Sequence, residues 1–273
     1  MADASLSESN KGTAQTVRFR GGGFAPKPRR WTGIAVFVVL ILVLEWGTQS
    51  GWISALTLPK PSDVLGTLVE LHQSGQFTAH MVPSLTRLAV GGFLGAVAGI
   101  GTGILIGLFS YVRSGLVPLI AALFPVPKIA LLPLFVIWFG IDEGSKYALI
   151  AFGTFTPTVV ATYGAVDNVD RTLIRMGQSF GLSRLSIFRK IIKPGAMPGI
   201  LSGLRISLAI AIILLTAAEM LGAEYGIGAY VLQAGSLYDL DRLFAGVVIL
   251  SLLGVILNMI IGFLERRLLV WRV

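Results

Sequence analysis

The sequence predicts an all-α polytopic membrane protein with about six transmembrane helices. Of the 273 residues, 54% are apolar and 13% are charged, about half the charged share of a soluble domain. A helix needs about 20 mostly apolar residues to cross the hydrocarbon. Three uncharged stretches reach this length, at residues 88–112, 147–166 and 243–264. Three more contain one charge each: 31–53 with Glu45, 114–141 with Lys128, and 206–223 with Glu219.

These stretches are rich in glycine and do not alternate apolar with polar residues, so helices rather than barrel strands are expected. Residues 1–30 form a basic arm rich in Ser, Gly and Pro, expected to be disordered, and no cleavable signal is evident. The membrane domain is expected over residues 31–267 and a short tail over 268–273. The chain has no cysteine, which excludes disulfides and thiolate metal sites.

The first two spans flank a predicted external segment. Leu58-Pro-Lys-Pro-Ser62 indicates extended backbone, because each proline disfavours helix in the residue before it. Residues 62–71 are expected to form a short amphipathic helix, with its apolar side listed as Val64, Leu65, Leu68 and Leu71. Along the second span, glycine recurs every four residues, at Gly95, Gly99, Gly103 and Gly107. Such a stripe lets another backbone approach closely, so this face is expected to pack on a helix.

The third span is expected to be irregular, because it contains Pro118, Pro125, Pro127 and Pro133. Freed carbonyls are tolerated at membrane depth only beside protein or a water-filled cavity, so this span is expected to border a pathway or an interface. Lys128 is a cation within the same span. It has three open interpretations: a role in a pathway, snorkelling to the membrane surface, or neutralisation by a partner such as Glu219.

The loop over residues 166–199 carries two short helical patterns on either side of Gly181. The second has a predicted N-cap at Ser183, with Leu182 and Ile187 placed as a hydrophobic staple. Its apolar side is Leu185, Phe188, Ile191 and Ile192, and its basic side is Arg189, Lys190 and Lys193. Pro194 is expected to end the helix. This pattern is typical of a helix that lies on a membrane surface or docks into a groove on a partner.

Basic residues predict the orientation. Six spans put both termini on one side, and sixteen of the 22 Lys and Arg lie there: on the arm, near residue 113, on the loop and on the tail. The opposite side has two, Lys60 and Lys146. By the positive-inside rule, the termini and the loop face the cytoplasm. The net charge of +8 is therefore explained by membrane orientation rather than by a nucleic acid partner.

The loop resembles the signature of the inner-membrane permease subunits of binding-protein-dependent ABC importers. That signature is EAA, three residues, Gly, nine residues, Ile, one residue, and Leu-Pro. Gly181, Ile191 and Pro194 match the signature at this spacing. Arg175 replaces the glutamate of the signature, and Lys193 replaces its leucine. Further segments resemble the nitrate, sulfonate and taurine branch of the family: 58–61, 84–87, 125–134, 137–140, 188–198, 218–219 and 226–228.

The resemblance implies a type I ABC importer permease fold and a homodimer bound to two cytoplasmic ATPase subunits, fed by an extracytoplasmic binding protein. A small anion such as a sulfonate, taurine or nitrate is the implied cargo, and ATP and Mg²⁺ belong to the ATPase. The chain itself has no GxxxxGK[ST] motif, no catalytic residue and no metal site. The implied coupling residues are Gly177, Gly181, Leu182, Ser183, Leu185, Phe188, Ile191 and Pro194, among which Leu182, Leu185 and Phe188 would dock on the ATPase.

The implied pathway runs between the third and fifth spans, with candidate residues Pro125, Pro127, Lys128, Pro133 and Glu219. Glu219 has three open placements: facing the cavity, pairing with Lys128, or packing against the second subunit. Two alternative functions are an ion-gradient transporter, which would need a repeat or a second broken helix, and a membrane-embedded enzyme. The only histidines, His72 and His80, lie in the expected external region, eight residues apart, which is too far for a helical metal pair. A solvated surface position is expected for both.

Overall fold

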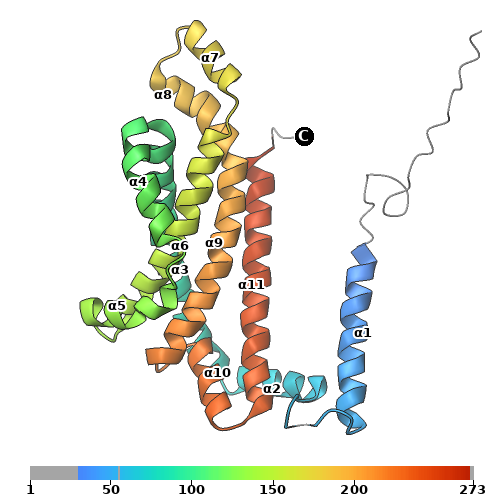
Figure 1. Cartoon of the computed structure of the whole chain (residues 1–273). Coiled ribbons are helices and arrows are strands. Elements are labelled where there is room, and N and C mark those ends of the chain that lie inside the picture. Colours follow the sequence, from blue (N-terminus) through green and yellow to red (C-terminus); the bar gives the residue numbers. More distant parts are fainter. Residues whose placement is uncertain (1–29, 55, 271–273) are drawn as a thin grey trace, which may run out of the picture.

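The computed structural model describes residues 30–54 and 56–270, and every regular element in these ranges is a helix (Figure 1). The predicted arm, apart from Arg30, and residues 271–273 of the predicted tail lie outside the described residues. The elements are α1 (Arg30–Gln49), α2 (Pro61–Gln73), α3 (Gln76–Leu108), α4 (Ser110–Leu123), η1 (Lys128–Leu131), α5 (Leu132–Phe139), α6 (Glu143–Asp167), α7 (Arg171–Ser179), α8 (Arg184–Ile187), η2 (Phe188–Ile192), α9 (Lys193–Gly222), α10 (Ile227–Ser236) and α11 (Leu240–Leu268).

Five helices are long and apolar enough to cross a membrane, and a sixth crossing results if α4 and the η1–α5 segment form one span. The predicted number of spans is therefore confirmed. Several helices extend beyond the predicted limits, since α3 begins at Gln76 and α9 at Lys193. Polar residues and prolines at these ends lower the hydropathy without ending the helix.

The glycine stripe of α3 packs along α6, as predicted. A β-carbon on Gly95 would lie 2.3 Å from the carbonyl oxygen of Ala151, and one on Gly103 would lie 2.5 Å from Cβ of Thr162. Both separations are far below van der Waals contact, so only glycine permits this spacing between the helices. Close backbone approach of this kind replaces the hydrophobic effect as the source of helix association in a membrane.

α9 packs on another side of α6, again where a glycine lets the two helices approach closely. A β-carbon on Gly203 would lie 2.1 Å from Cβ of Ala161. Buried apolar side chains fill the space where α3, α6, α9 and α11 meet, namely Leu88, Ile150, Ala211, Leu215 and Leu253. α3, α6 and α9 thus form one closely packed group of helices, which is called the three-helix unit below.

The third span is broken. α4 ends at Leu123, η1 begins at Lys128, and the two parts meet at 93°. Pro125 and Pro127 lie in the break, where their rings remove two backbone donors and oppose a continuous helix. α5 therefore extends sideways from the other helices (Figure 1). The predicted irregularity of this span is confirmed.

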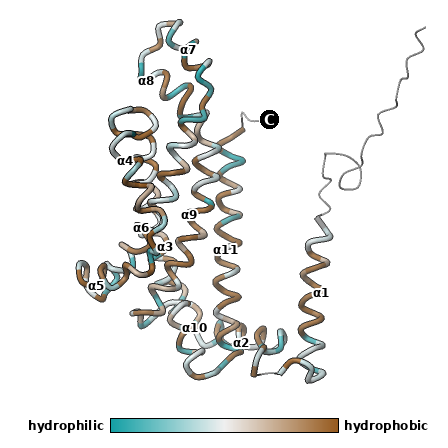
Figure 2. The backbone as a smooth tube through the Cα atoms, in the orientation of Figure 1, coloured by the Kyte–Doolittle hydropathy of each residue, from teal (hydrophilic) through white to brown (hydrophobic). Residues whose placement is uncertain are grey.

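α1 stands apart from the remaining spans in Figure 1, and Figure 2 shows that it is apolar over most of its length. It is attached through α2. The Glu45 carboxylate accepts the Ser62 backbone N–H at 3.0 Å and the Ser62 hydroxyl at 2.9 Å. The single charge of the first span thus binds the N-terminal end of α2, where an anion is favoured.

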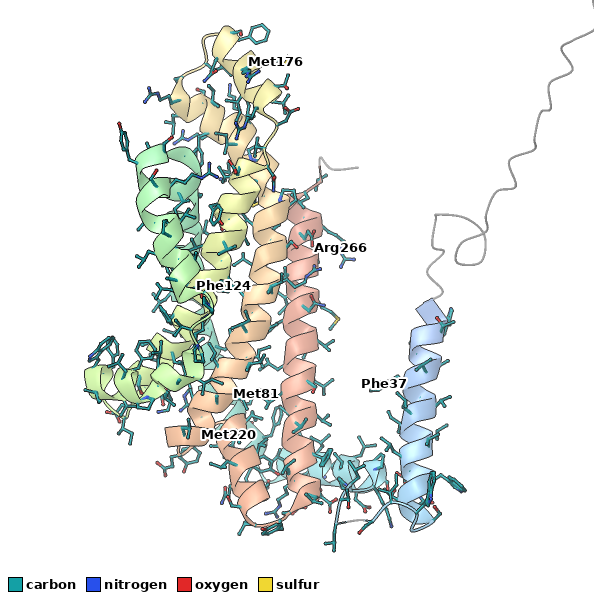
Figure 3. All side chains as sticks on the ribbon, in the orientation of Figure 1. Phe37, Met81, Phe124, Met176, Met220 and Arg266 are labelled. Carbon is teal, nitrogen blue, oxygen red and sulfur yellow. The ribbon has the colours of Figure 1, made fainter. Side chains whose placement is uncertain are left out.

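The short helix predicted after the first span is confirmed as α2, but its buried side differs in part from the prediction. Val64 and Leu71 are buried, whereas Leu65 is 63% exposed. α2 lies with α10 at one end of the molecule, called the far end below (Figure 1). The loop end is the opposite one, where α7, α8 and the C-terminal end of α11 lie. Figure 3 places Met176 at the loop end and Met220 near the far end.

Candidate functional site

The loop of residues 168–192 joins α6 to α9 at the loop end. The Asp170 side chain caps α7 by accepting the Thr172 N–H at 2.7 Å, and the Ser183 hydroxyl caps α8 by accepting the Ser186 N–H at 3.3 Å. Gly181 lies between the two helices with φ of +70°, a conformation that favours glycine. The predicted turn at Gly181 and the N-cap at Ser183 are confirmed.

One side of the loop packs on the chain itself. Gly177 is buried, and a β-carbon there would lie 2.9 Å from the Ile191 side chain. Leu182, Phe188 and Ile191 are partly buried against a cluster that includes Ile187 and Ile192. These contacts hold the loop against the inner parts of α6 and α9.

The other side of the loop is exposed and carries both apolar and basic side chains. The exposed apolar residues are Leu173, Met176, Phe180 and Leu185, of which Phe180 is 79% exposed. The exposed basic residues are Arg171, Arg175, Arg184, Arg189, Lys190 and Lys193. Of the three side chains expected to dock on a partner, only Leu185 lies on this surface, while Leu182 and Phe188 face inward.

The predicted end of the loop helix at Pro194 is wrong. The chain stays helical from Arg184 to Gly222, passing through the π-helix η2. Pro194 occupies the first turn of α9, where a missing N–H costs little, and the wider turn of η2 precedes it. The loop is therefore continuous with α9 rather than separated from it by a flexible joint.

The base of the loop is tied to the third span. Arg113 on α4 forms an ion pair with Asp167, the last residue of α6, with 2.7 Å between Nη2 and Oδ2. Arg171, at the start of α7, lies 3.8 Å from the other oxygen of the same carboxylate. α4 is therefore linked to the point where the loop begins.

The third-span residues lie around the break. Lys128 donates to the Phe124 carbonyl, and its ammonium lies 5.3 Å from the centre of the Phe124 ring. Pro133 lies in the first turn of α5 and lines an apolar cavity of about 340 Å³. The end of α9 also lines this cavity, through Ala218, Leu221 and Gly222.

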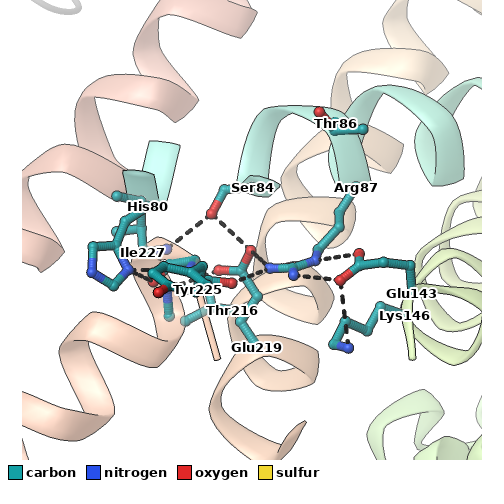
Figure 4. A network of polar contacts seen from close by, with 12 residues as sticks. His80, Ser84, Thr86, Arg87, Glu143, Lys146, Thr216, Glu219, Tyr225 and Ile227 are labelled. Atoms are coloured by element: carbon teal, nitrogen blue, oxygen red, sulfur yellow. Dashed lines mark hydrogen bonds and ion pairs between the residues drawn. The ribbon is translucent and has the colours of Figure 1, made fainter. Parts of the chain in front are cut away.

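Glu219 is fully buried, and its partner is Arg87 rather than Lys128 (Figure 4). Its Oε1 accepts Arg87 Nη1 at 2.8 Å and the Ser84 hydroxyl at 2.7 Å, and its Oε2 accepts the Gly228 N–H at 2.8 Å. The pairing with Lys128 that the sequence left open is therefore not formed. Glu219 is held inside one subunit by α3 and α10.

Arg87 also binds a second carboxylate. Its Nε and Nη2 donate to the two oxygens of Glu143 at 2.7 Å and 2.6 Å, and its Nη1 donates to the Tyr225 carbonyl at 2.6 Å (Figure 4). Lys146 lies 3.7 Å from Glu143. Two buried cations thus face two carboxylates, so the group is neutral. Such a network is stable in a low-dielectric interior only if each charge is paired and hydrogen-bonded.

Two glycines at the start of α10 leave the space that this network needs. A β-carbon on Gly226 would lie 2.4 Å from the Glu219 carboxyl carbon, and one on Gly228 would lie 2.6 Å from the Thr216 carbonyl oxygen. Gly226 also has φ of +147°. The Gly-Ile-Gly sequence therefore lets α10 approach the buried carboxylate closely, where its N-terminal N–H groups favour an anion.

Residues 76–270, which include the loop and the network, match the family described as "Binding-protein-dependent transport system inner membrane component". The chain belongs to this permease family. The permease is 35% identical over 272 residues to the aliphatic sulfonates transport permease protein SsuC of Bacillus subtilis, covering 99% of this chain and 96% of that protein. It is 36% identical over 249 residues to the taurine transport system permease protein TauC of Escherichia coli, covering 89% and 90%.

Solved structures confirm the fold of the permease. An inward facing conformation of the MetNI methionine ABC transporter matches with a TM-score of 0.60 at 22% identity, covering 68% of this chain and 93% of that one. An amino acid ABC transporter matches with a TM-score of 0.58 at 15% identity, covering 73% and 97%. The permease is thus a multi-pass inner-membrane protein with the type I importer fold.

Sequence reasoning missed Arg87 and Glu143 as members of the polar network. Arg87 immediately precedes an uncharged stretch of spanning length, and this was the available signal that its charge needs a buried partner. Nothing in the sequence marks Glu143, which follows the turn after α5. Both residues line a cavity of about 640 Å³ at the far end, together with Thr86, Asp142 and Glu224 among others.

His80 is not the solvated surface residue that was expected. It is partly buried, with its Nδ1 3.0 Å from the Gly226 oxygen, and its ring lies 5.4 Å from that of Tyr230. Burial raises the pKa of the Tyr230 phenol. His80 thus supports the same Gly226 turn that borders the network of Arg87. No group of His, Cys, Asp or Glu within the described ranges could hold a metal ion.

Proposed function

We propose that the permease forms the membrane pathway of an ATP-driven importer for a small solute with an anionic group, such as an aliphatic sulfonate or the sulfonate end of taurine. The relatives SsuC and TauC are named for aliphatic sulfonate and taurine transport, and they align over most of the chain. The observation that carries the proposal is the loop of residues 168–192. It presents an exposed apolar and basic surface and continues without a break into α9.

This loop contacts the cytoplasmic ATPase. Its exposed apolar side chains insert into a groove on that subunit, and the surrounding Arg and Lys form contacts that weaken with salt. The opposite side of the loop packs on α6 and α9 and keeps the loop in shape, through Gly177, Leu182, Phe188 and Ile191. Because the loop has no flexible joint to α9, ATP-driven closure of the ATPase moves the membrane helices directly.

The working assembly contains two copies of the permease, two ATPase subunits that bind ATP and Mg²⁺, and an extracytoplasmic binding protein. Large apolar side chains on the sideways segment around α5 remain exposed in one copy, including Ile137 at 79% and Trp138 at 63%. A second copy and membrane lipid cover this surface and α1. Nucleic acid has no part in the assembly.

The substrate passes beside the broken third span, near Pro125, Pro127, Lys128 and Pro133. Lys128 attracts an anion there. The carboxylate of Glu219 does not oppose the anion, because the guanidinium of Arg87 neutralises it. Loaded binding protein together with ATP favours the outward-open state, and hydrolysis restores the inward-open state.

Both termini face the cytoplasm in this arrangement. Green fluorescent protein fused to the C-terminus is expected to fluoresce, and alkaline phosphatase fused there is expected to be inactive. Alkaline phosphatase inserted after Trp52, in the turn that follows α1, is expected to be active. The reverse pattern would contradict the orientation, which rests on the distribution of Lys and Arg.

The contact with the ATPase is tested by Leu185→Asp. Leu185 is 56% exposed on the loop, and a charge there is expected to reduce ATPase co-purification about tenfold or more, because interface energy concentrates in a few apolar anchors. The matched control is Leu237→Asp, since Leu237 is 69% exposed at the far end. Membrane insertion is expected to be normal in both variants. Equal recovery of ATPase with both would argue against the loop as the docking element.

A further inference from the structure

We propose that Arg87 is a positioning residue for transport, which joins the far ends of the two helices that leave the ATPase-binding loop. It does so by holding Glu143 of α6 and Glu219 of α9 at the same time (Figure 4). The inference rests on the proposed function, since it concerns how movement at the loop reaches the other side of the membrane. Arg87 with its two carboxylates is called the far-end clamp.

The two carboxylates of the clamp lie at the ends of α6 and α9 that are farthest from the loop. The loop joins the last residue of α6 to the first residue of α9, so a force on the loop acts on these two helices first. Glu143 is the first residue of α6, and Glu219 lies in the last turn of α9. With 25 residues at a rise of 1.5 Å, α6 carries Glu143 about 37 Å from the loop. The clamp therefore closes the end of α6 and α9 that is opposite the loop.

The helices between loop and clamp have little freedom to slide. Near the clamp, a β-carbon on Gly91 would lie 2.8 Å from Cβ of Ile150, and near the loop one on Gly107 would lie 2.5 Å from the Val166 side chain. α9 meets α6 at equally short range, since a β-carbon on Gly199 would lie 2.6 Å from Cβ of Ala165. Packed interfaces of this kind change between discrete arrangements rather than deform continuously. The clamp completes a rigid body made of the three-helix unit.

The two carboxylates of the clamp differ in exposure. The side chains of Arg87 and Glu219 are 4% and 0% exposed, while that of Glu143 is 46% exposed. Glu219 keeps its bonds to Ser84 and Gly228 without Glu143, and Arg87 keeps its bond to the Tyr225 carbonyl. Glu143→Gln leaves one acceptor oxygen where Arg87 now binds two, so it weakens the link to α6 and leaves the buried pair of Arg87 and Glu219 intact. Lys146 keeps its bonds to the Ile141 and Asp142 carbonyls in this variant.

The same two helices, α6 and α9, join the clamp to the loop in both directions. If the clamp carries ATPase movement to the far end, it also carries the signal of the binding protein from the far end to the ATPase. In Glu143→Gln, stimulation of ATP hydrolysis by loaded binding protein is expected to fall about fivefold or more, because the coupling between the sites is weakened. Assembly with the ATPase and hydrolysis without binding protein are expected to match wild type, which a general folding defect would not allow.

The experiment uses the complex of the permease with its ATPase in lipid vesicles, with binding protein loaded with taurine or ethanesulfonate. Glu143→Asp retains the charge and is expected to recover most of the stimulation. Glu224→Gln is the matched control: Glu224 lines the same cavity but makes no hydrogen bond or ion pair with any described residue. Wild-type stimulation in Glu143→Gln would overturn the clamp, as would equal losses in Glu143→Gln and Glu224→Gln. Failure of the wild-type permease to bind an ATPase would instead overturn the proposed function.

Discussion

Glu219→Leu is expected to destabilise the permease by about 3–5 kcal/mol, because it leaves a buried cation without one of its partners. Glu219 is 1% exposed and accepts hydrogen bonds from Arg87, Ser84 and Gly228. In the variant, the Ser84 hydroxyl and the Gly228 N–H, both on buried residues, lose their acceptor. These two donors account for part of that cost, since an unsatisfied buried donor costs about 1–3 kcal/mol.

The measurement is thermal unfolding of the purified chain in detergent. Glu224→Leu removes an exposed carboxylate at the same end and is expected to melt at the wild-type temperature. Arg87→Leu combined with Glu219→Leu is expected to be less destabilising than the sum of the two single changes, because the double variant leaves no unpaired charge from this pair. Additive effects in the double variant would show that the two side chains do not stabilise each other.

Gly95→Leu is expected to cost at least about 3 kcal/mol and to separate α3 from α6, since the new side chain has no space. The first added carbon would already lie 2.3 Å from the Ala151 carbonyl oxygen and 2.8 Å from Cβ of Thr154. Backbone atoms at this distance cannot move aside without shifting the whole helix. Loss of folded protein in the membrane and loss of ATPase co-purification are therefore expected together.

The matched control for this change lies on the same helix. Gly101 is exposed, and a β-carbon there would meet nothing within 4 Å. Gly101→Leu is expected to be neutral or stabilising by about 0.5 kcal/mol, because leucine favours helix more than glycine does. Proteolysis of membranes and thermal unfolding distinguish the two variants. Equal stability of both would show that the glycine stripe does not set the distance between the helices.

The spans and the loop could be predicted from the sequence because their causes are local. Each membrane helix satisfies its own backbone hydrogen bonds, so an uncharged stretch of sufficient length is enough to indicate it. The break near Pro125 and Pro127 and the turn at Gly181 follow from the backbone chemistry of proline and glycine. Local rules also have a limit, since Pro194 was expected to end a helix and instead begins α9 after a π-helix.

The glycine stripe of α3 could be predicted from the sequence only in part. Its spacing of four residues indicated a packed face, because that spacing is a property of one helix. The identity of the partner, α6, depends on how the whole chain is arranged and could not be inferred from α3 alone.

Composition was sufficient to indicate a membrane protein with about six spans, and the distribution of Lys and Arg predicts the direction in which it faces. The partner of Glu219 was not accessible in this way. The sequence offered Lys128 within the neighbouring broken span, whereas the structure pairs Glu219 with Arg87, which is 132 positions away in the chain. Charge pairing inside a membrane depends on distance in space, where a few ångströms decide which cation neutralises a buried carboxylate. That spatial arrangement placed Arg87, Glu143 and Glu219 together, and it is the basis for the far-end clamp.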